Sequence, residues 1–330
     1  MKFCLHWSIV FALIVSMLLV SGCATRAKPF SIVVLPDTQY YADVRTADAE
    51  NYWHNGDLRA YFFAQTNWIK ANKDEMNIKM VLQLGDLVQA DDPREYEIAD
   101  RALSIIEDVV PYGLCIGNHD MGFGKSDKHS RTSRETNFND FFPPSRFQNN
   151  PLYDYGGNLD DVSDNYYLRF KAGGMKFLVL SFEFFPRDEV LVWANRVVSD
   201  HPDHRVIMFT HCFLSADGSL NDFKNYPLKG NTATEMWEEF VKQHKNIFLV
   251  LSGHIIGEAT VTTKGLHGNN VYQLLADYQQ NYNGGEGYLR IMTFHPNENR
   301  IDVTSYSPAI DESMTDHENQ FSLEYEMRGE

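Results

Sequence analysis

Cysteine is scarce in this chain of 330 residues, which contains 4. Beyond Cys23 only Cys115 and Cys212 remain, and each lies inside an apolar, strand-like run beside a polar motif. So few cysteines exclude the disulfide framework that stabilises small secreted domains. A single bridge between the two is one alternative, but we expect both to be small buried residues.

Basic residues are also in short supply. The chain has 29 Lys and Arg against 45 Asp and Glu, which gives a formal net charge of −16. Binding to nucleic acid depends largely on neutralising phosphates, so an acidic surface disfavours it, and the same argument applies to anionic lipid. We therefore expect no long nucleic acid among the partners.

The apolar run near the N-terminus, Ile9–Val20, is too short for a spanning helix, with roughly 12 residues against the ~20 required. Lys2 precedes it and Ser21-Gly22-Cys23 closes it, which is typical of an export signal. The ending Val20-Ser-Gly-Cys23 resembles a bacterial lipobox, which implies cleavage before Cys23 and a lipid attached to it. An ordinary signal peptide with an incidental cysteine is the alternative.

From this segment we predict a lipoprotein signal peptide over residues 1–22, a short tether over 23–29 and a single domain over 30–330. The mature protein is expected to be exported and anchored to a membrane through the lipid on Cys23, in the periplasm or at the cell surface.

Several common catalytic signatures are missing. The segment Gly122-Phe-Gly-Lys-Ser126 looks like part of a nucleotide-binding loop, but the leading glycine of that motif would fall on His119, and no strand precedes it at that register. His-Glu-x-x-His and Gly-x-Ser-x-Gly do not occur either.

Alternating strand-like and helix-like segments are present instead, and they predict layered α/β packing. Strands alone follow from Glu258 onward, which predicts a strand-rich C-terminal part. Tyr153–Asp164 and Asp311–Asn319 are the most loop-like stretches. The expected strands are Ser31–Leu35, Ile78–Leu84, Tyr112–Ile116, Asn165–Lys171, Lys176–Phe182, Arg205–Thr210, Ile247–Leu251, Ala259–Thr263, Val271–Leu275, Tyr288–Phe294, Arg300–Tyr306 and Gln320–Tyr325. The expected helices are Leu58–Lys73, Arg94–Val109, Asp188–Val198 and Thr232–His244.

Five of the expected strands end in a residue able to bind a metal. Carboxyl ends of parallel strands converge on one crevice in open α/β sheets, so these side chains are expected to form a cluster. Taken singly, each is more simply a turn residue or a buried histidine; together they indicate a metal site. The strand ends are Asp37, Gly85-Asp86, Gly117-Asn118-His119-Asp120, His211 and Ser252-Gly253-His254.

This order of motifs resembles the calcineurin-like metallophosphoesterase family over about Phe30 to Pro308. The segments Leu275-Ala-Asp-Tyr-Gln279, Gly284–Arg290 and Thr304–Pro308 are similar to those of an exported bacterial subgroup that begins Leu-Pro-Asp-Thr-Gln. The resemblance implies a two-sheet α/β sandwich with helices on its outer faces and a dinuclear metal centre between the sheet edges.

The resemblance also implies roles for the residues at the strand ends. Asp86 would bridge two divalent metal ions, and His119 would face the substrate, with Asp120 orienting it. One ion would be bound by Asn118, His211 and His254, and the other by Asp37 and Gln39.

Two positions depart from the family pattern. Gln39 stands where the family usually has histidine, and Ile256 stands where a second histidine usually follows Gly253-His254. Oxygen-rich ligation favours Mn or Fe, with Zn or Mg as alternatives. Asp277 or Gln279 would fill the gap in one reading; in the other, both residues are structural.

The expected reaction is hydrolysis of a phosphate monoester or diester by metal-activated hydroxide, without a covalent intermediate, and with His119 protonating the leaving oxygen. The substrate would be a phosphorylated small molecule or a diester. The alternative is a metal- or ligand-binding lipoprotein with a degenerate, catalytically weak site, which the isoleucine at position 256 motivates.

Two further segments are candidates for substrate contacts. The basic stretch from Lys125 to Arg134, with Lys125, His129 and Arg131, would recruit an anionic substrate; the alternative is a solvated loop. An aromatic group would form a pocket wall or simply pack beneath a loop. Its members are Tyr40, Tyr41, Tyr52 and Trp53.

Overall fold

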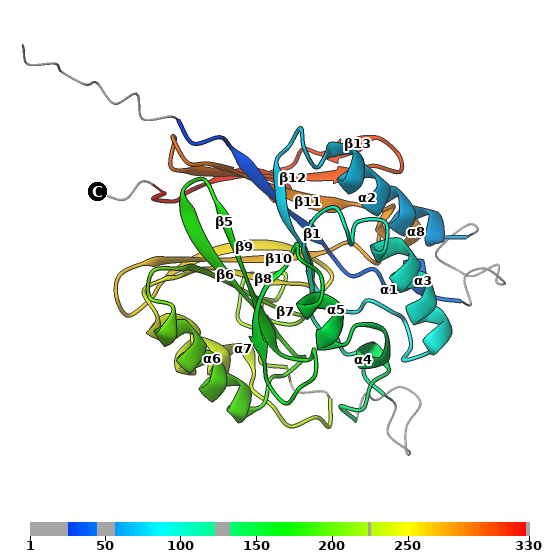
Figure 1. Cartoon of the computed structure of the whole chain (residues 1–330), viewed down its shortest axis with the longest axis horizontal. Helices are drawn as coiled ribbons and strands as arrows, with labels where there is room; N and C mark the ends of the chain where they lie inside the picture. Colours follow the sequence, from blue (N-terminus) through cyan, green and yellow to red (C-terminus); the bar gives the residue numbers. More distant parts are fainter. Residues whose placement is uncertain (1–25, 45–56, 123–132, 224–225, 328–330) are drawn as a thin grey trace, which may run out of the picture.

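The computed structural model describes residues 26–44, 57–122, 133–223 and 226–327. Two sheets of seven strands each lie against one another, and helices cover their outer faces (Figure 1). This is the α/β sandwich predicted from the alternating segments and from the family resemblance.

The first sheet combines strands from the beginning and the end of the described chain. Its order is β13-β12-β11-β1-β2-β3, with β14 also paired to β12. The strands β1, β2 and β3 run parallel, so their carboxyl ends meet at one edge. The strands are β1 (Phe30–Leu35), β2 (Ile78–Gln83), β3 (Tyr112–Leu114), β11 (Leu289–His295), β12 (Arg300–Ser307), β13 (Glu312–Met314) and β14 (Gln320–Glu324).

The second sheet has the order β4-β5-β6-β7-β8-β10-β9. Its four central strands β6, β7, β8 and β10 are parallel, and antiparallel strands flank them. The strands are β4 (Asp154–Asn158), β5 (Tyr166–Ala172), β6 (Met175–Phe182), β7 (Arg205–Thr210), β8 (Ile247–Ser252), β9 (Gly257–Lys264) and β10 (Asn270–Asp277).

The period-2 alternation of strand side chains creates the core between the sheets. Ile32 and Val34 of β1 pack in the same buried cluster as Ile207 and Phe209 of β7. The intervening Val33 faces away from the second sheet and joins a different cluster.

Helices bury the outer faces of both sheets. The helices α2 and α3 cover the first sheet, where Phe62 and Ala99 pack with Val33. The helices α6 and α7 cover the second sheet, where Leu191 and Met236 join the outer cluster (Figure 1). The helical segments are α1 (Gln39–Ala42), α2 (Arg59–Asn72), α3 (Pro93–Leu103), α4 (Phe138–Phe141), α5 (Pro144–Gln148), α6 (Asp188–Asp200), α7 (Ala233–Glu239), the 3-10 helix η1 (Val241–Gln243) and α8 (Tyr282–Gly285).

Five sequence expectations need correction, and one is the strand-only C-terminal part, which contains the short helical segment α8. The helix predicted to reach Val109 ends at Leu103, before a stretch rich in β-branched residues, and β3 is shorter than predicted. A strand, β4, lies within Tyr153–Asp164, the stretch expected to be a loop, because its side chains do not alternate between apolar and polar. Residue 156 of this strand must be glycine, because a Cβ there would lie 1.8 Å from the ring of Tyr167. A short strand, β13, occupies part of the second predicted loop.

The cysteine expectation is confirmed, because Cys115 and Cys212 are both buried and unbridged. Among the described residues, no helix is long and apolar enough to cross a bilayer.

The inter-sheet core offers a direct test of the fold. Phe177 is fully buried and contacts the rings of Phe170 and Phe294 at centroid distances of 4.7 and 5.9 Å. We expect Phe177→Ala to lower the free energy of unfolding by about 3–5 kcal/mol, through lost burial and the cavity left behind. Val192→Ala on the outer face of α6, where the side chain is 53 % exposed, should change it by less than ~0.5 kcal/mol. Urea denaturation of both variants measures the difference, and equal effects would contradict the assigned core.

Candidate metal centre

The carboxyl ends of parallel strands from both sheets lie at the same edge of the sandwich. Each of these strands is followed within a few residues by one or more of the side chains predicted to form the site. These residues are Asp37 after β1, Asp86 after β2, Asn118, His119 and Asp120 after β3, His211 after β7 and His254 after β8.

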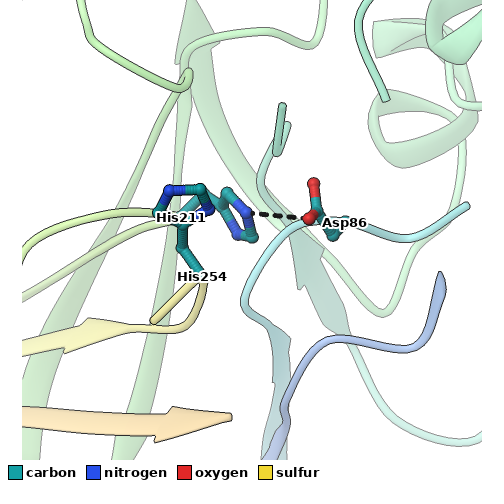
Figure 2. A group of neighbouring side chains, drawn as sticks. All are labelled: Asp86, His211 and His254. Atoms are coloured by element: carbon teal, nitrogen blue, oxygen red, sulfur yellow. Dashed lines mark ion pairs between the residues drawn. The ribbon is translucent and has the colours of Figure 1, made fainter. Parts of the chain in front are cut away.

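Asp86, His211 and His254 form the centre of this group (Figure 2). Their candidate ligand atoms all lie within 4.8 Å of one another, and Asp86 Oδ2 is 3.1 Å from His211 Nε2. His211 is completely buried, and Asp86 is nearly so. The three residues come from both sheets, so only the sandwich brings them together.

The hydrogen bonds of His211 decide which ring nitrogen faces the site. Its Nδ1 lies 2.8 Å from the carbonyl oxygen of Leu84, which can only accept, so Nδ1 carries the proton. Its Nε2 then faces Asn118 Oδ1 and Asp86 Oδ2, each at 3.1 Å. An imidazole nitrogen and two oxygens that all offer lone pairs to one point are a donor set suited to a divalent cation.

Asp86 is held in a strained but well-supported position. Its φ of +49° is rare for a residue other than glycine, and such strain is typical of functional sites. The backbone N–H of His119 donates to Asp86 Oδ1 at 2.7 Å, and a Cβ on Gly117 would lie 2.1 Å from that same oxygen. Burial acts to raise the pKa of Asp86, but the nearby His211 and His119 outweigh it and hold the pKa well below its usual value.

Asp37 lies at the edge of the same site, 4 % exposed. Both of its oxygens accept from the backbone N–H of His254 at 3.3 Å. A Cβ on Gly253 would lie 2.2 Å from Asp37 Oδ1, so the close approach requires glycine at that position. Burial, and then the charges of Asp277 and Asp86, raise the pKa of Asp37 well above its usual value.

Gln39 supplies an unsatisfied oxygen. The residue is buried in the first turn of α1, and its Oε1 has no hydrogen-bond partner. The preceding residue, Thr38, donates its backbone N–H to the carbonyl of Asp86 at 3.2 Å, which holds this segment against the Asp86 turn. A buried amide oxygen without a donor costs free energy unless something binds it, so Gln39 also fits a cation.

Backbone carbonyls position two of the histidines, and the sequence carries no signal for them. The carbonyl of Gln89 lies 2.7 Å from His119 Nδ1 and orients that ring, as the carbonyl of Leu84 orients the ring of His211.

Asp120 accepts from the backbone N–H groups of Gly117 at 2.8 Å and Val88 at 3.0 Å. Burial, and then the charge of Asp86, raise the pKa of Asp120 to about 7. The predicted role of Asp120 in orienting His119 stays a prediction.

The predicted substrate contacts Lys125, His129 and Arg131 lie outside the described residues, as do Tyr52 and Trp53. Arg134, at the end of the same basic stretch, is described and serves the fold. Its guanidinium donates to the carbonyls of Phe184 at 3.1 Å, Phe185 at 2.7 Å and Lys229 at 2.7 Å.

The two described tyrosines of the predicted aromatic group lie close to α1 and α8. Tyr41 is buried, donates to the carbonyl of Gly284 at 2.6 Å and accepts from the N–H of Gly287 at 2.9 Å. This pattern of bonds favours the packing alternative for Tyr41. Tyr40 is half-buried.

Sequence reasoning missed an aromatic wall beside the histidines. The ring of Phe184 lies 5.7 Å from that of His211 and 5.2 Å from that of His254, and Tyr226 lies 5.9 Å from His254. Phe184 follows β6, which runs parallel to β7. The sequence signal that could have revealed this wall is the segment Glu183-Phe-Phe-Pro186, which follows one more parallel strand.

Two residues from the C-terminal part complete the surroundings. Asp277 ends β10 and is 1 % exposed, and burial raises its pKa to about 6. Gln279 donates its backbone N–H and its side-chain N–H to the two oxygens of Asp277, each at 2.9 Å.

The sequence of residues 31–258 matches the model of the calcineurin-like phosphoesterase family. The chain belongs to the calcineurin-like phosphoesterases. Membership implies hydrolase activity and suggests metal-dependent hydrolysis of phosphoesters, in agreement with the convergent donor set described above. The strands from β10 onward lie outside the matched region.

Among curated proteins, the chain is similar to "Uncharacterized protein YvnB" of Bacillus subtilis (strain 168), with 31 % identity over 313 residues. The alignment covers 91 % of this phosphoesterase and 22 % of the relative. The chain thus spans about a fifth of the length of that protein.

Among solved structures, the fold is similar to GAP50, the anchor in the inner membrane complex of Plasmodium, with a TM-score of 0.42 and 12 % identity over 91 % of this chain and 90 % of that one. It is also similar to the NAD nucleotidase NadN of Haemophilus influenzae, with a TM-score of 0.38 and 10 % identity over 90 % of this chain and 51 % of that one. At such scores neither likeness bears on the reaction of this phosphoesterase.

Metal removal tests the centre directly. A ligand that binds only the folded state stabilises it by about 2.7 kcal/mol at a concentration of 100 times its Kd. We expect Mn²⁺ to raise the Tm of chelator-stripped protein by several degrees, and Asp86→Asn to lose most of that rise. Asp154→Asn, which changes an exposed carboxylate paired with Arg169, should keep it. An equal rise in the Asp86 variant, measured by scanning calorimetry, would contradict the assigned centre.

Proposed function

We propose that this phosphoesterase hydrolyses a phosphate monoester or diester at a dinuclear centre of divalent ions, Mn or Fe being the expected metals and Zn or Mg the alternatives. The observation that carries the proposal is the convergence of His211 Nε2, Asn118 Oδ1 and Asp86 Oδ2 in a buried site, with His119 following directly on Asn118.

The proposed ligands form two sets that share Asp86. His211, Asn118 and His254 would hold one ion, and Asp37 and Gln39 would hold the other. Asp86 stays ionised and offers two oxygens, so it is the residue suited to bridge. When bound, such ions act as Lewis acids toward a phosphoryl group and make a water acidic enough to supply hydroxide near neutral pH.

The chain's own residues supply the proton transfer. His119 is oriented by the bond between its Nδ1 and the carbonyl of Gln89, so its Nε2 is the nitrogen that exchanges a proton with substrate. Protonation of the departing oxygen by a positioned histidine typically contributes 10²- to 10⁴-fold in rate. The ring of Phe184 packs against both His211 and His254, and that of Tyr226 against His254, so an aromatic wall lies beside the two histidines.

A metal- or ligand-binding protein with weak catalysis is the second candidate, and Ile256 favours it. This side chain is 40 % exposed and apolar, and it stands where the family usually has a histidine ligand. The two candidate functions differ in the expected effect of removing His119: an enzyme would lose turnover, whereas a binding protein would not depend on this residue for its function.

The decisive assay is hydrolysis of a chromogenic phosphodiester and the corresponding monoester by metal-stripped protein refilled with Mn²⁺, Fe²⁺, Zn²⁺ or Mg²⁺. We expect His119→Ala to lower kcat by about 10²- to 10⁴-fold while it leaves the Tm rise on Mn²⁺ binding intact, because the residue moves a proton and is not a ligand. His267→Ala, at the turn between β9 and β10, is the matched control and should keep full activity. Turnover unchanged by His119→Ala would contradict the mechanism; no turnover with any metal would favour the binding protein.

We also propose that the protein is exported and anchored to a membrane through lipid on Cys23, in the periplasm or at the cell surface. Support comes from the segment Ile9–Cys23, which lies outside the described residues. The acidic net charge agrees with an anchor that is covalent and hydrophobic, because it disfavours electrostatic attachment to anionic lipid.

Fractionation of cells that express the full chain tests the anchor. The native protein should be recovered with membranes and should incorporate a labelled fatty acid, whereas Cys23→Ala should lose the label. Cys115→Ala, which changes a buried cysteine, is the control and should keep it. Label that persists in Cys23→Ala would contradict the lipidation site.

A further inference from the structure

The last strand of the second sheet, β10, ends in a buried carboxylate beside the metal centre. We propose that Asp277 is a ligand of the second divalent ion, where it takes the place of the histidine that Ile256 replaces. With Asp37, Asp86 and Gln39 it would make this an all-oxygen site for a hard cation. The inference rests on the dinuclear function proposed above and names the residue that completes its second half.

Strand register places Asp277 beside the segment that follows β8. β10 is parallel to β8, with Leu275 opposite Ser252, the last residue of β8. β10 is antiparallel to β9, with Asp277 directly opposite Gly257. Gly257 follows Ile256, so the carboxylate arises from the strand position adjoining the missing ligand.

Asp37 links this strand end to the rest of the centre. Its oxygens accept from the N–H of His254, two residues before Ile256. The charge of Asp277 also acts on Asp37 and contributes to raising its pKa.

Neither Asp37 nor Asp277 forms an ion pair with a lysine or an arginine among the residues that the structure describes. Asp37 receives only the backbone bond from His254, and Asp277 only the two bonds from Gln279. Buried carboxylates are expected to be paired or to coordinate a metal, because leaving them uncompensated is costly. A divalent ion supplies the missing positive charge.

Two buried amide oxygens point independently to a ligand. Gln39 Oε1 and Gln279 Oε1 are both inaccessible to solvent and have no hydrogen-bond partner. Gln39, which is 2 % exposed, lies two residues from Asp37, and Gln279 is bonded to Asp277 through the other atom of its amide. Neutral oxygens of this kind are common ligands of hard cations.

The composition of this second site predicts its metal preference. Carboxylate and carbonyl oxygens suit Mg²⁺, Ca²⁺ and Mn²⁺, whereas imidazole nitrogens suit Zn²⁺ and Fe²⁺. The two histidines His211 and His254 both belong to the first site, so the two ions of the pair would have different chemistry. Asp277 lies beyond residues 31–258, so the family match does not cover it.

Asp277→Asn tests the assignment with metal stoichiometry as the readout. The substitution keeps the shape and one acceptor oxygen for the N–H of Gln279, and it removes the charge. Equilibrium dialysis with Mn²⁺ should give two ions per native chain, and in the variant one ion with unchanged affinity and a second weakened at least ten-fold. The electron paramagnetic resonance signal of a coupled Mn²⁺ pair should disappear in the variant. Asp164→Asn is the matched control: burial likewise raises the pKa of Asp164 to about 6, but the residue lies outside the five strand ends.

Ile256→His provides a second test that does not depend on how well the first variant folds, because this side chain is 40 % exposed. It adds an imidazole next to the second site and should raise the preference of the second ion for Zn²⁺ over Mn²⁺ at least ten-fold. A native chain that binds one ion, an Asp277→Asn variant that binds two with native affinities, or an Ile256→His variant with unchanged preference would each overturn the proposal.

These outcomes are separable from failure of the proposed function, because no ester is hydrolysed in either measurement. A chain that binds two ions as described but turns over no phosphoester would contradict the function and leave Asp277 as a ligand. If the native chain hydrolyses a phosphoester but its Asp277→Asn variant still binds both ions, the proposed function stands and Asp277 is not a ligand.

Discussion

The hydrogen bond from His211 Nδ1 to the carbonyl of Leu84 joins the two sheets at the point where the candidate metal ligands converge. His211 follows β7 of the second sheet and Leu84 follows β2 of the first, and the 2.8 Å bond sets the ring so that Nε2 meets Asn118 and Asp86. A Cβ on Gly85 would lie 2.6 Å from His211 Nδ1, so the turn after β2 must be glycine for the ring to fit. The site therefore depends on how closely the two sheet edges approach.

That approach has an electrostatic consequence. It buries the carboxylates of Asp37, Asp86 and Asp277 in one place with histidines but without lysine or arginine partners among the described residues. Burial raises the pKa of Asp37 and Asp277, whereas the neighbouring His211 and His119 keep Asp86 ionised. The fold thus creates a deficit of positive charge that bound cations would offset, and metal binding and folding are expected to be coupled.

The arrangement also separates positioning from chemistry. Residues that would contact metal or substrate come from side chains at strand ends, and the groups that orient them are often backbone atoms, such as the carbonyls of Leu84 and Gln89. Arg134 extends this principle, since its guanidinium fixes the Phe184–Phe185 segment, and the ring of Phe184 packs against those of His211 and His254. An arginine that looks on sequence grounds like a substrate contact is used to hold an aromatic wall.

The sequence by itself determined the class of the fold, the identity of the strand-end residues and the two departures at Gln39 and Ile256, because strand alternation and residue type are local properties. It could not reveal β4, whose polar residues form a strand only because β5 pairs with them, nor the carbonyl partners of the histidines. The position of Asp277 opposite Gly257, next to Ile256, also needed the tertiary structure, because it follows from the pairing of β10 with β9. Contacts between residues far apart in the chain depend on sheet order and register, which the alternation of side chains along a strand does not specify.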